Sequence, residues 1–221
     1  PIHLKRGIIM KVKLRKVSSL SPEEISNCCP DCLSMLFADF GPMDLSTDSI
    51  TQWLSERELA EKNGDDLRFV LWEHSDCCGP TTMVSITRLF AELDFAHLKC
   101  YYNEPTLRSG LATAVCQAAI SHAFEQNFTS RILAKAPYSD PLTRNLYSSI
   151  PLSLFTELTA LGIGSSQSVP YEIRKENPVW KSWDYDSVLK EAKSRLQSGR
   201  EIVDWSEQMM DLDGRLDSQT A

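Results

Sequence analysis

Residues 96–150 decide the fold of this chain, and they read AHLKCYYNEPTLRSGLATAVCQAAISHAFEQNFTSRILAKAPYSDPLTRNLYSSI. The pattern predicts a strand at 96–102, a loop of small residues, a helix of about four turns, a second strand and a short helix ending at Tyr147. The loop runs directly into the start of the long helix. Unpaired backbone N–H groups and the positive end of the helix dipole meet there, so the sequence predicts an anion-binding site.

A run of six residues forms the predicted anion site. Gly110 lets the backbone approach a ligand closely, and the small side chains of Ala112 and Thr113 hinder it little more. The expected ligand is a small molecule that carries phosphate groups. The six residues are Arg108, Ser109, Gly110, Leu111, Ala112 and Thr113.

The order strand, Pro-x-x-Arg, small-residue loop, helix, strand and short helix with a late Tyr resembles the acetyl-CoA-binding core of the GNAT N-acyltransferases. That family carries a Gln/Arg-x-x-Gly-x-Gly/Ala loop for the pyrophosphate. Pro105 stands three residues before Arg108, which suits the family spacing. In an alternative alignment, Gly110 and Ala112 match the two small positions of the family loop. Leu107 then stands where the family has Gln or Arg. The two alignments differ by one residue.

Two further positions depart from the family pattern. The family often has an Asn-x6-Tyr pair, whereas here Asp140 stands seven residues before Tyr147. After the Tyr, SSIPL replaces the usual Lys-x-Gly-Phe. The resemblance covers about 55 residues well and about 110 more loosely.

The resemblance implies a GNAT-like α/β fold, with a mixed and mostly antiparallel sheet flanked by helices. In the family, the backbone of the corresponding strand pairs with the pantetheine arm of the cofactor. The resemblance therefore implies that Tyr101 and Tyr102, at the end of the strand at 96–102, bind the cofactor together with the six loop residues. Tyr147 falls where the family places the general acid that protonates the departing thiolate. An alternative for Tyr147 is an amphipathic residue at the edge of the core.

The general base is harder to assign. Glu104 follows the strand and lies beside the loop, so it is our candidate. His97 within the strand, and Glu92 and Asp94 before it, are alternatives. Each of the carboxylates can equally be a solvated surface group.

The expected function is transfer of an acetyl or other acyl group from acyl-CoA to an amine, by direct attack in a ternary complex. The amine belongs either to a small molecule or to a protein. One alternative is a GNAT-fold binding or regulatory module without catalysis, which the departures in the loop and after Tyr147 favour. Another is an acyltransferase that uses acyl carrier protein; the acidic chain argues against the basic docking patch that it needs.

Composition points to a compact cytoplasmic protein. The chain has 221 residues, of which 42% are apolar and 24% charged, so it can bury a core. The net charge of −7 argues against a nucleic-acid partner. No run of 18 apolar residues suggests a membrane span, and the start has no secretory signal.

We expect three segments. Residues 1–9 are expected to be a non-native leader, because Met10 opens a credible strand and Lys5-Arg6-Gly7 back-translates to a purine-rich stretch like a ribosome-binding site. Residues 10–176 form the acyltransferase domain, and 177–221 a helical extension. Within the domain the pattern predicts strands at 11–17, 67–73, 81–89 and 169–173, one or two strands within 152–163, a helix after Ser21 and a helix at 48–62.

The extension is expected to form two helices, at 187–197 and 202–216. They either pack on the domain as a hairpin or act as a homodimer interface or a lid. Their acidic face could also meet a basic partner.

Five of the seven cysteines fall in two clusters, Cys28/Cys29/Cys32 and Cys77/Cys78. Cys29 and Cys32 have the spacing of zinc and redox motifs, and His74 could be a further ligand. Adjacent cysteines make poor paired ligands, so we expect ordinary reduced thiols and no metal site.

Overall fold

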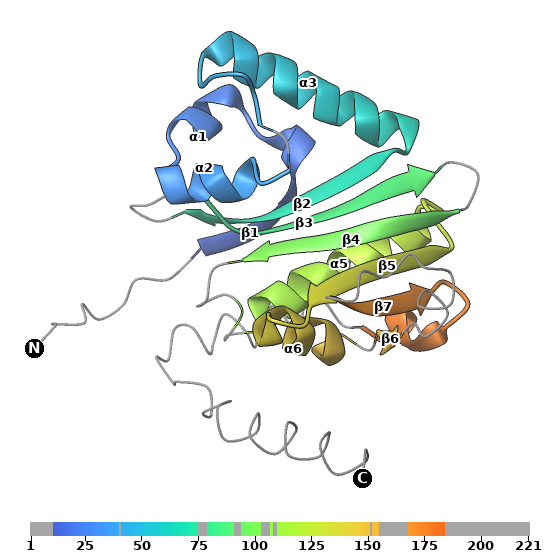
Figure 1. Cartoon of the computed structure of the whole chain (residues 1–221). Coiled ribbons are helices and arrows are strands. Elements are labelled where there is room, and N and C mark those ends of the chain that lie inside the picture. Colours follow the sequence, from blue (N-terminus) through green and yellow to red (C-terminus); the bar gives the residue numbers. More distant parts are fainter. Residues whose placement is uncertain are drawn as a thin grey trace, which may run out of the picture.

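The computed structural model shows one α/β unit (Figure 1). It describes residues 11–39, 41–74, 79–90, 94–102, 107, 110–150, 152–154 and 168–183. The predicted leader, the two helices of the extension, and residues Cys77 and Cys78 therefore lie outside the described part.

Three helices connect the first strand to the second. They are α1 (Pro22–Ser26), α2 (Pro30–Leu36) and α3 (Thr47–Asn63), preceded by the 3-10 turn η1 (Val17–Ser19). Ser21 begins α1 with a capping box, in which its side chain and that of Glu24 exchange backbone hydrogen bonds. Gly64 ends α3 in the left-handed conformation, with φ of 73°. The helices at Ser21 and 48–62 are thus confirmed, whereas α2 was not predicted.

The strands form one seven-stranded sheet in the order β1-β2-β3-β4-β5-β7-β6. Every neighbouring pair is antiparallel except β4 and β5, which are parallel. This mixed and mostly antiparallel sheet is the predicted one. Its strands are β1 (Lys11–Lys16), β2 (Asp66–His74), β3 (Gly79–Phe90), β4 (Phe95–Tyr102), β5 (Arg131–Pro137), β6 (Ser153–Leu154) and β7 (Ser168–Arg174).

Two more helices follow the central strands. α5 (Leu111–Glu125) joins β4 to β5, and α6 (Pro141–Ser149) follows β5. α1–α3 lie on one side of the sheet and α5 and α6 on the other (Figure 1). A helix between two parallel strands has to cross over the sheet, and α5 provides this crossover.

The two faces of the sheet bury separate cores. On one face, the apolar side chains of α5 pack against those of β2–β5, for example Leu71, Ile86 and Leu98. On the other face, Trp53 of α3 joins Val70 and Met83 of the sheet. Because side chains alternate along a strand, β2 and β3 serve both cores at once.

The packed core continues past the predicted domain boundary at residue 176. Trp180, in the 3-10 turn η3 (Pro178–Ser182), is 7% exposed and packs against Phe124 of α5 with ring centroids 5.4 Å apart. Its indole N–H donates to the carbonyl of Lys175 at 2.8 Å. The turn therefore belongs to the folded domain. No helix in the described part of the chain is long and apolar enough to cross a membrane.

We expect Trp180→Ala to lower the free energy of unfolding by about 3–5 kcal/mol, because it leaves a large cavity beside Phe124. Urea denaturation followed by circular dichroism measures this change. Glu176→Ala, at an exposed neighbouring position, is the control and should change stability little. A loss below about 1 kcal/mol for Trp180→Ala would show that η3 does not belong to the core.

Candidate functional site

β4 and β5 are joined along only part of their length. The parallel register pairs Phe95–Leu98 with Arg131–Ala134 and goes no further. Beyond Leu98, β4 remains bonded to β3 as far as Tyr102, and β5 remains bonded to β7 as far as Pro137. The two strands therefore diverge into a fork. Each strand stays hydrogen-bonded to its outer neighbour, whereas the facing inner edges of β4 and β5 are not bonded to each other.

Side chains at the fork alternate between the two faces of β4. Cys100 and Tyr102 join the core beneath α5. Lys99 and Tyr101 point to the opposite face, where both donate hydrogen bonds of 2.6 Å to Asp39, which follows α2. The fork thus separates two chemically different surroundings. Of the two predicted cofactor-binding tyrosines, only Tyr102 has its side chain on the α5 face.

Tyr147 of α6 reaches the inner edge of β4. It is 2% exposed, and its ring lies 5.7 Å from that of Tyr171. The backbone of Cys100, two residues past the last β4–β5 pair, lies close to its hydroxyl. Burial raises the pKa of Tyr147 well above its ordinary value, and the nearby thiols of Cys100 and Cys116 raise it further. The hydroxyl therefore stays protonated near pH 7 and has a proton to donate.

A hydrogen-bonded chain orients α6 against β4. Asp140 is the N-cap of α6 and accepts from the backbone N–H of Thr143 at 3.0 Å and from its hydroxyl at 2.5 Å. The Thr143 hydroxyl also bonds the hydroxyl of Tyr102 at 2.7 Å. Asp and Asn are equally good N-caps, so the departure from the family's Asn preserves the helix start.

The start of α5 lies beside the fork, in the loop that follows β4. Gly110 is its N-cap, with φ of 82°, a conformation that favours glycine. Helix geometry leaves the amides of Ala112 and Thr113 without a partner inside the helix. The Thr113 hydroxyl bonds that of Ser149 at 3.0 Å, which ties α5 to α6. Of the six predicted loop residues, Gly110, Leu111, Ala112 and Thr113 form this helix start, and Arg108 and Ser109 lie outside the described residues.

The candidate bases fall in different places. Glu104 and Glu92 lie outside the described residues. Asp94 lies at the other end of β4, where its carbonyl accepts from the hydroxyl of Thr129 and its carboxylate from the N–H of Ser130. Asp94 is therefore a turn residue. His97 lies next to the fork.

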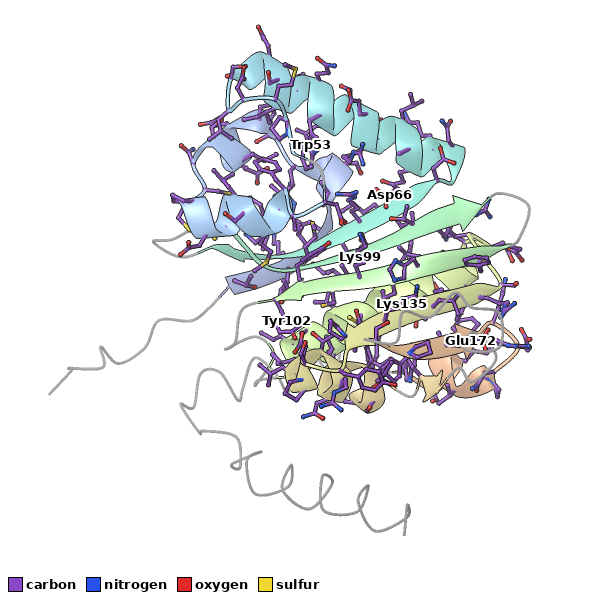
Figure 2. The ribbon with its side chains drawn as sticks, viewed as in Figure 1. Trp53, Asp66, Lys99, Tyr102, Lys135 and Glu172 are labelled. Atoms are coloured by element: carbon purple, nitrogen blue, oxygen red, sulfur yellow. The ribbon has the colours of Figure 1, made fainter. Side chains whose placement is uncertain are left out.

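His97 sits among charged groups on the face opposite α5. Burial lowers the pKa of His97 to about 4, and the positive charges of Lys99 and Lys135 lower it further, against the opposing charge of Asp39. The imidazole is therefore neutral near pH 7 and can accept a proton. Figure 2 shows Lys99 and Lys135 on the neighbouring strands β4 and β5.

The first cysteine cluster surrounds the start of α2. Cys29 is the N-cap of α2, and the neighbouring backbone and side chain of Cys32 lower its pKa. Cys28 and Cys32 lie against Gly79 at the start of β3. Among the described residues, no group of three or more His, Cys, Asp or Glu is placed to hold a metal ion.

Sequence reasoning missed Asp39, Lys99, Lys135 and Thr143. Alternation along β4 and β5 could have placed both lysines on one face with His97. The register between the strands, which brings the two lysines to the same fork, has no local signal. Asp39 comes from a distant segment and was not predictable.

No protein-family model matches the sequence, and no curated protein matches it. Solved structures do match its fold. They include the ribosomal-protein-S5-alanine acetyltransferase of Vibrio fischeri, with a TM-score of 0.54 and 12% identity over 78% of this chain and 97% of that one. A GNAT-family acetyltransferase of Streptococcus pneumoniae gives a TM-score of 0.52 and 10% identity over 74% and 99%.

A third similar structure is the spermidine N-acetyltransferase of Vibrio cholerae in complex with CoA and spermine. Its TM-score is 0.50, with 13% identity over 76% of this chain and 98% of that one. The chain thus has the fold of the GNAT N-acetyltransferases. At these identities the likeness establishes the fold and not the reaction.

We expect Lys99→Gln to raise the pKa of His97 from about 4 toward its ordinary value near 6.5. The substitution removes a positive neighbour and releases Asp39, and both changes favour the imidazolium. Titration of the His97 ring by NMR, assigned with His97→Gln, measures it.

Because the folded-state pKa of His97 is lowered, the free energy of unfolding should also fall as the pH drops from about 6.5 to about 4, and less so in His97→Gln.

Lys62→Gln, on the exposed side of α3, is the control for the loss of one lysine and should leave the titration of His97 unchanged. A pKa above 6 for His97 in the wild-type protein would contradict this description of the face opposite α5.

Proposed function

We propose that this protein transfers an acyl group from acyl-CoA to an amine. The observation that carries the proposal is the fork between β4 and β5, with the hydroxyl of Tyr147 beside the backbone of Cys100 at the inner edge of β4. A thioester lying along β4 in the fork would bring its sulfur close to this hydroxyl. The similarity in fold to known acetyltransferases supports the proposal.

The cofactor is proposed to be acetyl-CoA or another acyl-CoA. Its pantetheine arm would pair with the inner edge of β4 at Lys99–Tyr102, where β5 has moved away. Its pyrophosphate would lie at the start of α5, on the amides of Ala112 and Thr113 and the helix dipole. Arg108 and Ser109 belong to the same loop in sequence and would complete the site. The Vibrio cholerae structure of the same fold holds CoA, which supports CoA as the cofactor.

In the proposed reaction the amine attacks the thioester carbonyl directly. A C–N bond forms, the C–S bond breaks, and the thiolate takes the proton of the Tyr147 hydroxyl. Burial disfavours the phenolate, but it disfavours a thiolate in the same site too, so the raised pKa of Tyr147 does not by itself block the transfer. Tyr147 regains its proton from solvent after CoA leaves.

The amine must lose a proton during the reaction. The neutral imidazole of His97 lies on the face from which an amine could enter the fork, so we propose it as a base beside Glu104. An imidazole with a low pKa is a weak base, and the thioester is already activated. Alignment of the two reactants would therefore supply most of the rate enhancement.

We expect Thr113→Glu to weaken acetyl-CoA binding at least tenfold, because its carboxylate would repel the pyrophosphate at the start of α5. An acidic residue in the first turn of a helix is favourable, so the substitution should not lower the melting temperature by destabilising α5. Isothermal titration and thermal unfolding measure the two effects.

Thr113→Gln is the matched neutral control, and it loses the bond to Ser149 equally. Equal affinities of the Gln and Glu variants for acetyl-CoA would contradict the assignment of the pyrophosphate to this helix start.

We expect Tyr147→Phe to lower kcat by about 10²- to 10⁴-fold with little change in the KM for acetyl-CoA, because it removes only the proton donor. Steady-state release of CoA with an amine panel measures this. Tyr171→Phe, which keeps the neighbouring ring and loses its hydroxyl, is the control and should retain most activity.

Three results would redirect the proposal. Full activity of Tyr147→Phe would remove Tyr147 from the mechanism. Binding of acetyl-CoA without turnover on any amine would indicate a binding or regulatory module. Preference for acyl carrier protein over CoA would identify a different acyl donor.

A further inference from the structure

Two lysines stand at the mouth of the fork on the side away from α5. The last residues to pair are Leu98 of β4 and Ala134 of β5, and Lys99 and Lys135 come directly after them. Residues paired in register point to the same face, so both lysines lie on the face of His97. This is the face from which an acceptor would approach the acyl group in the proposed reaction.

Two acidic groups near the lysines in the described part of the chain already have partners. Asp39 accepts from Lys99 and from Tyr101, and its side chain is only 10% exposed. Glu172, which lies opposite Leu133 on β7, is held by Arg131 at 2.7 Å and Arg174 at 3.1 Å. Among the described residues the local charge around the fork is therefore positive, although the whole chain carries a net charge of −7.

More hydrogen-bond donors lie beneath Lys99. Ser85 of β3 is the cross-strand partner of Lys99, and Arg68 of β2 is the partner of Ser85, so the three share one face. Ser85 is 0% exposed and Arg68 is 8% exposed. Neither the hydroxyl of Ser85 nor Nη1 of Arg68 has a hydrogen-bond partner within the described residues. Buried polar atoms of this kind are usually satisfied, so these two point to a polar group that binds here.

We propose that the acceptor amine carries a carboxylate, bound by Lys99 and Lys135 at the mouth of the fork, with Ser85 and Arg68 as deeper donors. This inference rests on the proposed acyltransferase function and names its substrate class. The ammonium groups match a carboxylate as point charges, and the guanidinium of Arg68 adds a directed donor. Lys99 would exchange part of its contact with Asp39 for the substrate.

The same arrangement disfavours cationic acceptors. A polyamine would place its second ammonium near two lysines, and like charges at short range repel. The Vibrio cholerae structure contains spermine. Although this chain shares its fold with that enzyme, we expect a different acceptor class because the charge at the fork is positive.

The test uses matched acceptors that differ only in the carboxylate. These are 4-aminobutyrate against butylamine, and phenylalanine against phenethylamine, with spermidine as the cationic acceptor. We expect kcat/KM to favour each acid by at least tenfold over its partner, and spermidine to be the poorest. A peptide with free N-terminal alanine followed by two glutamates is a second arm; higher kcat/KM for it than for the free acids places the carboxylate on a peptide acceptor.

Charge reversal at the fork gives the second test. Lys135→Glu should lower kcat/KM for the acids at least tenfold and raise it for spermidine, whereas the KM for acetyl-CoA should stay unchanged. Ser85→Ala removes one buried hydroxyl beneath Lys99 and should raise the KM for the acids only. Lys62→Glu makes the same charge change on the exposed side of α3, paired there only with Glu58 in the described contacts, and should alter neither preference.

The outcomes separate this inference from the proposed function. If neither acetyl-CoA nor CoA binds, the inference and the proposed function are both overturned. Turnover that favours butylamine or spermidine, or a preference for acids that survives Lys135→Glu, would overturn the inference and leave the acyltransferase function standing. If acetyl-CoA binds without turnover, equal affinity of the CoA complex for N-acetyl-4-aminobutyrate and N-butylacetamide would overturn the inference.

Discussion

The arrangement of this protein depends on where the hydrogen bonding between β4 and β5 stops. Four residue pairs join these strands, and beyond Leu98 each strand is held only by its outer neighbour. Beyond Leu98 the facing edges of the two strands are therefore not paired with each other, and Tyr147 of α6 lies close to the β4 backbone at Cys100.

The fork makes the alternation of β4 functionally important. Cys100 and Tyr102 lie with α5 and α6, while His97 and Lys99 face the opposite side. In the proposed reaction, a molecule bound along β4 at the fork meets groups from both faces, Tyr147 as the acid from one and His97 as the base from the other. This is why the proposed cofactor and acceptor are assigned to different faces of one strand.

Several departures from the family pattern become understandable once their hydrogen bonds are known. Asp140 in place of Asn caps α6 through Thr143, and thereby positions both Tyr102 and Tyr147. The Cys-Pro-Asp-Cys stretch, which suggested metal or redox chemistry, begins α2. Pro30 at its first position is a recognised helix-start signal that the cysteines obscured. Trp180 lies beyond the domain boundary that the sequence suggested at residue 176. Its burial against Phe124 depends on a contact with a distant helix, so the local sequence carries no sign of it.

The sequence by itself determined the order of the strands and of the helices other than α2, the glycine-containing loop that leads into α5 and the short helix that carries Tyr147. These follow from local periodicity, glycine conformation and capping, which act over a few residues. Only the tertiary structure decided that β4 and β5 part after Leu98, and that Lys99 and Lys135 meet Asp39 and His97 there. The physical reason is that pairing between parallel strands joins residues separated by a whole crossover helix. Such pairing depends on packing across the sheet and leaves no mark in the local pattern.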